Sequence, residues 1–344
     1  MVVPLQHNPP AKPSAASDSP AGISPASPPA RPGWIKVRRL GADVRGMMQR
    51  ELGGIATVCR EANCPNIGEC WARGTATYMI MGDVCTRNCA FCDVSFGKPK
   101  PLDPQEPARL AQSVAALGLK YSVITCVDRD DLADSGAAHW AACIGAIRAG
   151  CGALELAPNA AGSGADTFAG ADAFSARYLR GVGIEVLTGD FKGQEQPLAT
   201  AVLAAPDVFA HNVETVPRLQ KLARHKATWE RSLRVLIAAK RIAREAGQRT
   251  LIKSGMMLGL GETDAEVREA LALLREAGVE LLTLGQYLRP RNVPGKLEMQ
   301  RFVTPEEFTA LRDYALGLGF LGVAASPLTR SSHLAETLYA QAAK

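Results

Sequence analysis

Short apolar runs alternate with amphipathic stretches along most of the chain. The runs lie at 75–82, 121–127, 183–190, 207–214, 250–260 and 280–288. Between them, the stretches at 106–119 and 264–278 space their apolar residues as one face of a helix does. Repeated strand–helix units predict a parallel sheet. Six such units predict an α/β fold, a partial (β/α)6 barrel of the TIM type.

Polar residues stand where the predicted strands end. They are Thr125, Asp128, Thr188, Asp190, His211, Asn212, Glu262, Gln286 and Arg289. Because parallel strands end at one edge of a sheet, these side chains are expected at the same mouth of the barrel, where the reactive groups of such folds lie. Any single one of them could equally be an ordinary loop residue.

The flanks of the barrel have different compositions. Residues 1–33 are rich in Pro, Ala and Ser and are predicted to be disordered, with order beginning near Trp34. Residues 34–74 form a cysteine-rich N-terminal extension, 75–290 the barrel, and 291–344 a C-terminal closing segment. The Gly/Ala-rich stretch at 149–183 interrupts the barrel as an insertion that covers one side of it, with one further short strand at 153–157.

Composition excludes several classes of protein. The chain has 344 residues, 47% of them hydrophobic, yet no apolar run reaches the ~18 residues that cross a membrane. Its start lacks a secretory signal and is poor in arginine, so we expect a cytoplasmic protein, or an organellar one in a eukaryote. A net charge of +5 does not imply nucleic acid. Basic residues gather between 218 and 249, as a solvated helix face or a docking face for an acidic protein.

Cysteine use indicates metal rather than disulfides. Six of the nine cysteines lie between 59 and 92, and none of the five histidines is nearby. In a chain without a secretory signal, such clustering is typical of metal sites. The lack of histidine argues against Cys2His2 zinc chemistry. Cys126, Cys143 and Cys151 fall in no ligand spacing and are expected to be core or surface thiols.

One triad, Cys85, Cys89 and Cys92, follows the first predicted strand with the spacing C-x3-C-x2-C. Three thiolates leave one iron of a 4Fe-4S cluster open, and an open position marks a reacting metal. S-adenosylmethionine can fill that position, and one electron from the cluster then cleaves it to a 5′-deoxyadenosyl radical. A zinc or purely structural thiolate site is the alternative.

A second triad lies just upstream. Cys59, Cys64 and Cys70 are spaced C-x4-C-x5-C, again without a nearby fourth cysteine. Two such triads so close in sequence predict two clusters that face one cavity, unless the first triad is purely structural.

At these motifs the chain resembles the lipoyl synthases, a family of radical S-adenosylmethionine enzymes. The resemblance is carried by EANCPNIGECW, GDVCTRNCAFCDV, TCVDRDDL, EVLTGDFKG, DVFAHNVETVPRL, KSGMMLGLGET, LTLGQYLRP, RFVTPEEF and SPLTRSSHLAE, and runs from about residue 34 to 336. It implies a radical cluster on Cys85, Cys89 and Cys92, and an auxiliary 4Fe-4S cluster on Cys59, Cys64 and Cys70. Its implied fourth ligand is Ser332, whose alternative role is a helix cap or a solvated tail.

The resemblance also implies a reaction and its partners. Two sulfur atoms, taken from the auxiliary cluster, enter an octanoyl chain carried on a lysine at carbons 6 and 8. The carrier would be the glycine cleavage H protein or the E2 component of a 2-oxoacid dehydrogenase. An electron donor such as ferredoxin or flavodoxin and an iron–sulfur carrier would also bind, but no nucleic acid or membrane. The rival assignments are a biotin synthase-like enzyme, a methylthiotransferase and a zinc-bearing nucleic-acid-binding module.

Contacts to S-adenosylmethionine are predicted for Asn212, Glu214 and Gln286. The chain departs from the family pattern at three places. His333 replaces a tyrosine, Gly189 replaces a proline and should loosen its turn, and the insertion at 149–183 replaces a short connection.

Overall fold

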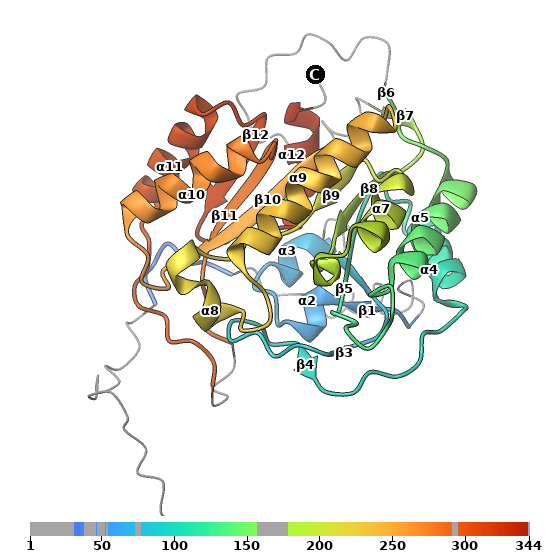
Figure 1. Ribbon diagram of the computed structural model, residues 1–344, viewed down its shortest axis with the longest axis horizontal. Coiled ribbons are helices and arrows are strands. Elements are labelled where there is room, and N and C mark those ends of the chain that lie inside the picture. The colour runs from blue at the N-terminus through green and yellow to red at the C-terminus, as the bar shows by residue number, and fades with distance from the viewer. Residues whose placement is uncertain are drawn as a thin grey trace, which may run out of the picture. The chain divides into compact units, whose positions relative to one another are not determined.

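The computed structural model describes residues 31–37, 46, 52, 54–72, 77–156, 178–290 and 295–342 (Figure 1). The disorder predicted for 1–33 falls almost wholly outside the described residues, as do 157–177 of the insertion. Trp34, near which order is predicted to begin, is 45% exposed, whereas its neighbour Ile35 is 5% exposed.

An eight-stranded sheet organises the chain. Its order is β1 (Ala56–Thr57), β2 (Thr77–Ile80), β5 (Tyr121–Cys126), β8 (Gly183–Leu187), β9 (Val208–Ala210), β10 (Leu251–Leu258), β11 (Leu281–Gln286) and β12 (Gly322–Ser326). All neighbours pair in parallel except β1, which is antiparallel to β2. The six predicted strands are confirmed. β12 adds a seventh parallel strand, and the sheet is not closed by hydrogen bonds.

Helices follow the strands round the outside of the sheet (Figure 1). They are α4 (Glu106–Ala116), α5 (Ala137–Cys151), α7 (Glu195–Leu203), α9 (Trp229–Glu245), α10 (Asp264–Glu276) and α11 (Pro305–Gly317). α10 begins where the sequence predicts, because Thr263 and Glu266 form a capping box, and it buries Leu271 and Leu274 against the sheet. Among the described residues, none of the helices combines the length and apolarity needed to cross a membrane.

Short elements complete the described chain. They are α2 (Val58–Glu61), α3 (Ile67–Ala72), β3 (Val84–Cys85), β4 (Ser95–Phe96), β6 (Glu155–Leu156), β7 (Tyr178–Arg180), η1 (Phe191–Gly193), η2 (Pro217–Leu219) and α8 (Gln220–Ala223). β6 is the short strand predicted in the insertion, and it pairs antiparallel with β7. Most of the basic run at 218–249 lies on η2, α8 and α9, as a helical surface requires, but Arg224 lies outside these helices and is buried.

The C-terminal helix α12 (Ala335–Ala342) packs on the inner face of the sheet. Side chains alternate along a strand, so Tyr121, Val123 and Thr125 of β5 share one face. Tyr121 and Val123 contact α12, and the ring centroids of Tyr121 and Tyr339 are 5.6 Å apart. Leu338 joins Val208 and Leu281 in a second apolar cluster. α12 thus fills the inside of the barrel at the amino ends of the strands.

Arg87 fastens the loop between β2 and β4 to the barrel. Its guanidinium donates to Asp130 at 2.8 and 2.9 Å and to Asp190 at 2.6 Å. Arg231 approaches the other oxygen of Asp190 at 3.2 Å. Burial would raise the pKa of Asp190, but the hydrogen bond and charge of Arg87 outweigh it and hold that pKa well below its ordinary value. The loop therefore has a rigid base.

Leu338→Ala should lower the free energy of unfolding by about 2–5 kcal/mol, because it removes buried apolar contact and leaves a cavity inside the barrel. Leu316→Ala, on an exposed position of α11, is the matched control and should change it by less than about 0.5 kcal/mol. Urea unfolding followed by circular dichroism measures both. Equal losses of unfolding free energy in the two variants would contradict the packing of α12 inside the barrel.

Asp190→Asn should cost about 1–3 kcal/mol near neutral pH, because the buried Arg87 loses one carboxylate partner and keeps Asp130. The folded pKa of Asp190 lies below its ordinary value of 3.8, so the stabilisation is complete above that pH and is lost as pH falls through the folded pKa. The difference between the two proteins should narrow in acid, as measured by urea unfolding at several pH values. Asp103→Asn, at an exposed pair with Arg109, should show almost no difference at any pH. If the difference in unfolding free energy between the two proteins stayed constant into acid, the proposed interaction of Asp190 with Arg87 would be contradicted.

Candidate functional site

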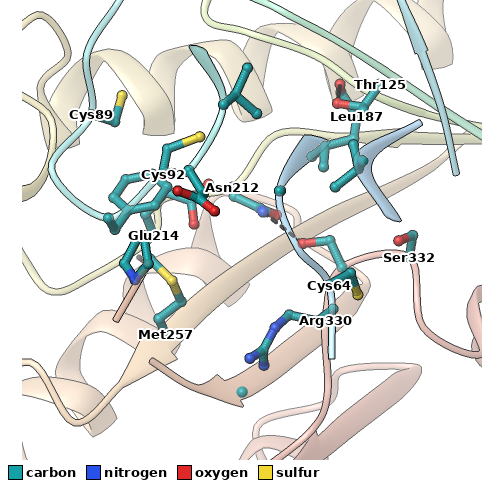
Figure 2. Close-up of a pocket in the computed structure, with 18 of the residues that line it drawn as sticks. Cys64, Cys89, Cys92, Thr125, Leu187, Asn212, Glu214, Met257, Arg330 and Ser332 are labelled. Carbon is teal, nitrogen blue, oxygen red and sulfur yellow. Dashed lines mark hydrogen bonds between the residues drawn. The ribbon is translucent and has the colours of Figure 1, made fainter. Parts of the chain in front are cut away.

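A cavity of about 890 Å³ opens at the carboxyl ends of the strands (Figure 2). Most of the polar residues predicted at the strand ends line it, namely Thr125, Asp128, Thr188, His211, Asn212, Gln286 and Arg289. The other two have structural roles. Asp190 binds Arg87, and Glu262 accepts the backbone N–H groups of Gly259 and Leu260 at 2.6 and 2.9 Å.

The triad Cys85, Cys89 and Cys92 lies on one side of this cavity and all three residues line it. Cys85 ends β3, and its Sγ accepts hydrogen bonds from the backbone N–H groups of Arg87 and Asp128 at 3.4 and 3.3 Å. Such N–H···S contacts are typical around thiolates that bind iron. The loop is also tied to α8, where the carbonyl of Ala223 accepts from the N–H of Ala90 at 3.0 Å.

Burial raises the pKa of all three thiols. It raises that of Cys89 to about 12 and that of Cys92 to about 11, and it also raises that of Cys85. The positive charge of Arg224 acts against this at Cys89. Thiols held protonated by burial become thiolates when a metal replaces the proton, so the site is built for a ligand that brings positive charge.

The second triad is assembled by a helix–turn–helix. Cys59 lies on α2, Cys70 on α3, and Cys64 in the turn between them. The backbone N–H of Cys64 donates to the carbonyl of Cys59 at 3.2 Å, and that of Cys70 to the carbonyl of Asn66 at 2.9 Å. Cys64 lines the cavity, while Cys59 is 5% exposed. Burial raises the pKa of Cys59 and of Cys64.

The segment after β12 brings Ser332 to the side of the second triad. Asn66 Nδ2 donates to the carbonyl of Leu328 at 2.7 Å, across 262 residues of sequence. Cys64, Arg330 and Ser332 all line the cavity, and Figure 2 shows them across the view from Cys89 and Cys92. α12 begins at Ala335 with Leu334 before it, so Ser332 is not its N-cap. The helix-cap alternative was wrong.

A close approach to β11 fixes the same segment. A Cβ atom on Gly285 would lie 2.1 Å from the carbonyl oxygen of Thr329, so only glycine lets the two backbones meet there. Asn212 Nδ2, just after β9, donates to Ser331 Oγ at 2.6 Å. The C-terminal segment is therefore part of the cavity wall.

Two departures from the family pattern are explained by contacts. His333 Nε2 lies 3.5 Å from Glu69 Oε2 on α3, so this side chain joins the tail to the helix that carries Cys70. Gly189 does not use the left-handed backbone conformation of a loosened turn. It provides space instead, because a Cβ atom there would lie 2.2 Å from Asp128 Oδ1. The structure therefore gives Gly189 a different role from the one expected.

Among the described residues, no group of three His, Cys, Asp or Glu side chains is arranged to hold a single metal ion. A zinc site brings four ligands onto one metal, whereas each cysteine of a cubane binds a different iron.

Two groups beside the first triad are poised for a polar ligand. Asn212 Oδ1 is buried without a hydrogen-bond partner among the described residues. Glu214 is held in the left-handed region at φ 72°, and burial raises its pKa. Strained, buried polar groups of this kind are typical of ligand sites. A ligand that donates hydrogen bonds would satisfy both.

Three further cavity residues escaped the sequence analysis. Arg330 is half-buried, desolvation lowers its pKa, and the charge of Cys64 acts against that. It lies inside the quoted motif SPLTRSSHLAE, which was the available signal. Arg224, whose Nη1 donates to the carbonyl of Asn212 at 2.9 Å, was hidden among the surface basic residues. Cys126 lines the cavity although it was expected to be a plain core or surface thiol, whereas Cys143 is buried in the core.

Solved structures share the architecture. Methylornithine synthase matches 77% of this chain and 68% of its own with a TM-score of 0.50 at 14% identity. A maturase of the [FeFe]-hydrogenase matches 87% of this chain and 66% of its own, also with a TM-score of 0.50 at 14% identity. At this identity the likeness extends to the fold alone.

Sequence comparison is more specific. The Radical SAM superfamily model matches residues 79–274. The lipoyl synthase of Methylococcus capsulatus is 47% identical over 92% of this chain and 89% of its own. That of Pyrobaculum calidifontis is 47% identical over 90% of this chain and 96% of its own. That of Laribacter hongkongensis is 50% identical over 81% of this chain and 78% of its own. The chain therefore belongs to the lipoyl synthase family of the radical S-adenosylmethionine superfamily.

Proposed function

We propose that this enzyme inserts two sulfur atoms at carbons 6 and 8 of an octanoyl group carried on a lysine of a lipoyl-carrier protein. Family membership supports the reaction class. The observation that carries the proposal is geometric. The whole first triad, Cys64 of the second triad and Ser332 line one cavity, with Cys64 across it from Cys89 and Cys92 (Figure 2). A carbon radical and its sulfur source must come within bonding distance, which a shared cavity allows.

Each triad has its own role in this proposal. Cys85, Cys89 and Cys92 hold the radical 4Fe-4S cluster, and S-adenosylmethionine takes the open iron. The auxiliary 4Fe-4S cluster is held by Cys59, Cys64, Cys70 and Ser332. When bound, these groups supply the one-electron cleavage of the sulfonium and the sulfur atoms that the product gains. A serine oxygen suits iron less well than a thiolate does, so Ser332 is the ligand that yields most readily.

The polar residues beside the first triad bind S-adenosylmethionine in this proposal. The free acceptor of Asn212 and the carboxyl group of Glu214 suit its ammonium and hydroxyl donors. Gln286 has much of its amide engaged, because Nε2 donates to three carbonyls and Oε1 accepts from the N–H of Val303 at 2.8 Å. Its contact with the cofactor stays a prediction, and bracing the cavity wall is the role its bonds support.

The cavity also suits the alkyl chain and its carrier. Leu187, Met257 and Phe302 give the wall apolar surface against which an octanoyl chain can pack. The carrier would be the H protein of glycine cleavage or an E2 component of a 2-oxoacid dehydrogenase. Ferredoxin or flavodoxin would supply electrons, and an iron–sulfur carrier would rebuild the auxiliary cluster. We propose that all of this happens in the cytoplasm, or in an organelle in a eukaryote.

A mass measurement tests the function. Anaerobic protein is incubated with S-adenosylmethionine, a reductant and an octanoyl-lysine peptide, and the peptide should gain two sulfur atoms. Cys89→Ala removes a radical-cluster ligand, so formation of 5′-deoxyadenosine should fall at least about 100-fold. Cys64→Ala should still form 5′-deoxyadenosine but no thiolated peptide. Lipoyl product from Cys64→Ala would exclude the auxiliary cluster as the sulfur source.

Ser332→Cys tests the serine ligand. It completes a four-thiolate set, which holds a cluster more securely and should make it a poorer sulfur donor. We expect a full complement of iron, continued cleavage of S-adenosylmethionine and at least about tenfold less lipoyl product. Ser326→Cys, on β12 and hydrogen-bonded to Thr329, is the control for a new thiol nearby. Normal product yield from fully loaded Ser332→Cys would rule out ligation by Ser332.

A further inference from the structure

A buried ion pair crosses the inside of the barrel. Lys253 of β10 is 1% exposed and Glu185 of β8 is fully buried, and Lys253 Nζ lies 2.6 Å from Glu185 Oε1. Both strands pair with β9, so the two side chains reach over that strand. Alternation puts Lys253 on the same face as Met257, and Glu185 on the same face as Leu187. Both of those neighbours line the cavity, so the pair lies directly beneath it.

The ion pair joins the two ends of the barrel interior. Lys253 Nζ also donates to the carbonyl of Ser331 at 2.7 Å. On the other side, the hydroxyl of Tyr121 donates to Glu185 Oε2 at 3.0 Å, and Tyr121 packs against Tyr339 of α12. One continuous series of contacts therefore runs from α12 through two charged side chains to the residue before Ser332.

Stability alone does not account for this pair. Removing two charges from water is costly, and well-packed apolar residues of similar size are often as stable or more so. An apolar pair, however, could not bind the carbonyl of Ser331. Ser331 is held at that carbonyl by Lys253 and at its hydroxyl by Asn212 Nδ2, at 2.7 and 2.6 Å. The barrel therefore binds the hydroxyl of Ser331. The neighbouring Ser332 faces the cavity.

We infer that Lys253, oriented by Glu185, is a positioning residue that holds the Ser331 carbonyl and so sets Ser332 for the auxiliary cluster. This inference rests on the proposed ligand role of Ser332. Lys253 helps to hold the cluster in place and does not contact the substrate. Losing the lysine should loosen the serine end of the cluster and leave the three cysteines in place.

The test uses the double variant Glu185→Gln/Lys253→Met. It removes both charges together, so neither is left buried alone, and the amide that replaces the carboxylate keeps an acceptor for Tyr121. The matched control is Lys240→Met/Glu280→Gln. This second Lys–Glu pair has Nζ and Oε1 2.7 Å apart, joins α9 to the start of β11, and makes no described contact with the tail. Both are made in a background with Cys85, Cys89 and Cys92 replaced by alanine, so that only the auxiliary cluster remains.

Iron release to a chelator is followed under anaerobic conditions, together with the unfolding temperature and the spectrum of the reduced cluster. The inference predicts iron release at least about tenfold faster than in the control variant, with an altered spectrum, while the unfolding temperatures stay close. A merely structural pair would lower the unfolding temperature and leave the release rate and the spectrum like those of the control. That result would overturn the inference.

Two further outcomes are kept apart by the design. If the parent background itself holds no auxiliary cluster, the proposed function fails. If it holds the cluster and both double variants release iron alike, the inference about Lys253 fails alone. Should the double variant not fold, Lys253→Arg decides, because it keeps the charge beside Glu185 but sets a longer, planar group against the Ser331 carbonyl. Release at the parental rate from that variant would reject the positioning role.

Discussion

Parallel strands end at a common edge, and the site depends on that constraint. β5, β8, β9 and β11 each deliver polar residues to one mouth, whatever the length of chain between them. The cysteine loops need no regular structure of their own beyond a few short elements. They are held in place by contacts with the strand ends, as Cys85 is by the backbone N–H of Asp128. The rigid sheet fixes positions, and the loops bring the chemistry.

An open barrel leaves its interior to be filled, and the C-terminal segment fills it. β12 extends the sheet, the following residues form part of the cavity wall, and α12 packs on the inner apolar surface. The boundaries predicted at residues 75 and 291 therefore reflect where the sequence motifs change. In the folded protein the last segment shares a sheet and a core with the strands that precede it.

Much of the fold and of the candidate site could be predicted from the sequence, because the sequence signals for them are local. The six strands lie in short, largely apolar runs, and the two triads are set by spacing within a few residues. β12 was missed because GVAAS is short and built from small residues. Ser332 was found only through resemblance, since the contact that brings its segment to α3 spans 262 residues.

Charged residues were the hardest to predict. Lys253 stands in a strand whose sequence gives no hint that the lysine is buried, because its partner Glu185 comes 68 residues earlier. Arg224 stands among exposed basic residues in the sequence, and only the fold shows that it lines the cavity. Burial of a charge is decided by partners distant in sequence, which no local pattern records.

The placement of α12 has a consequence for the order of folding. Tyr121 is made long before the helix that covers it, because more than two hundred residues separate it from Tyr339. Until then the inner face of β5 and the carboxyl group of Glu185 lack their final partners, and contacts of such long sequence separation form late. The barrel interior is therefore filled only after α12 has been made. A chain that stopped before α12 would carry all nine cysteines and still lack that packing.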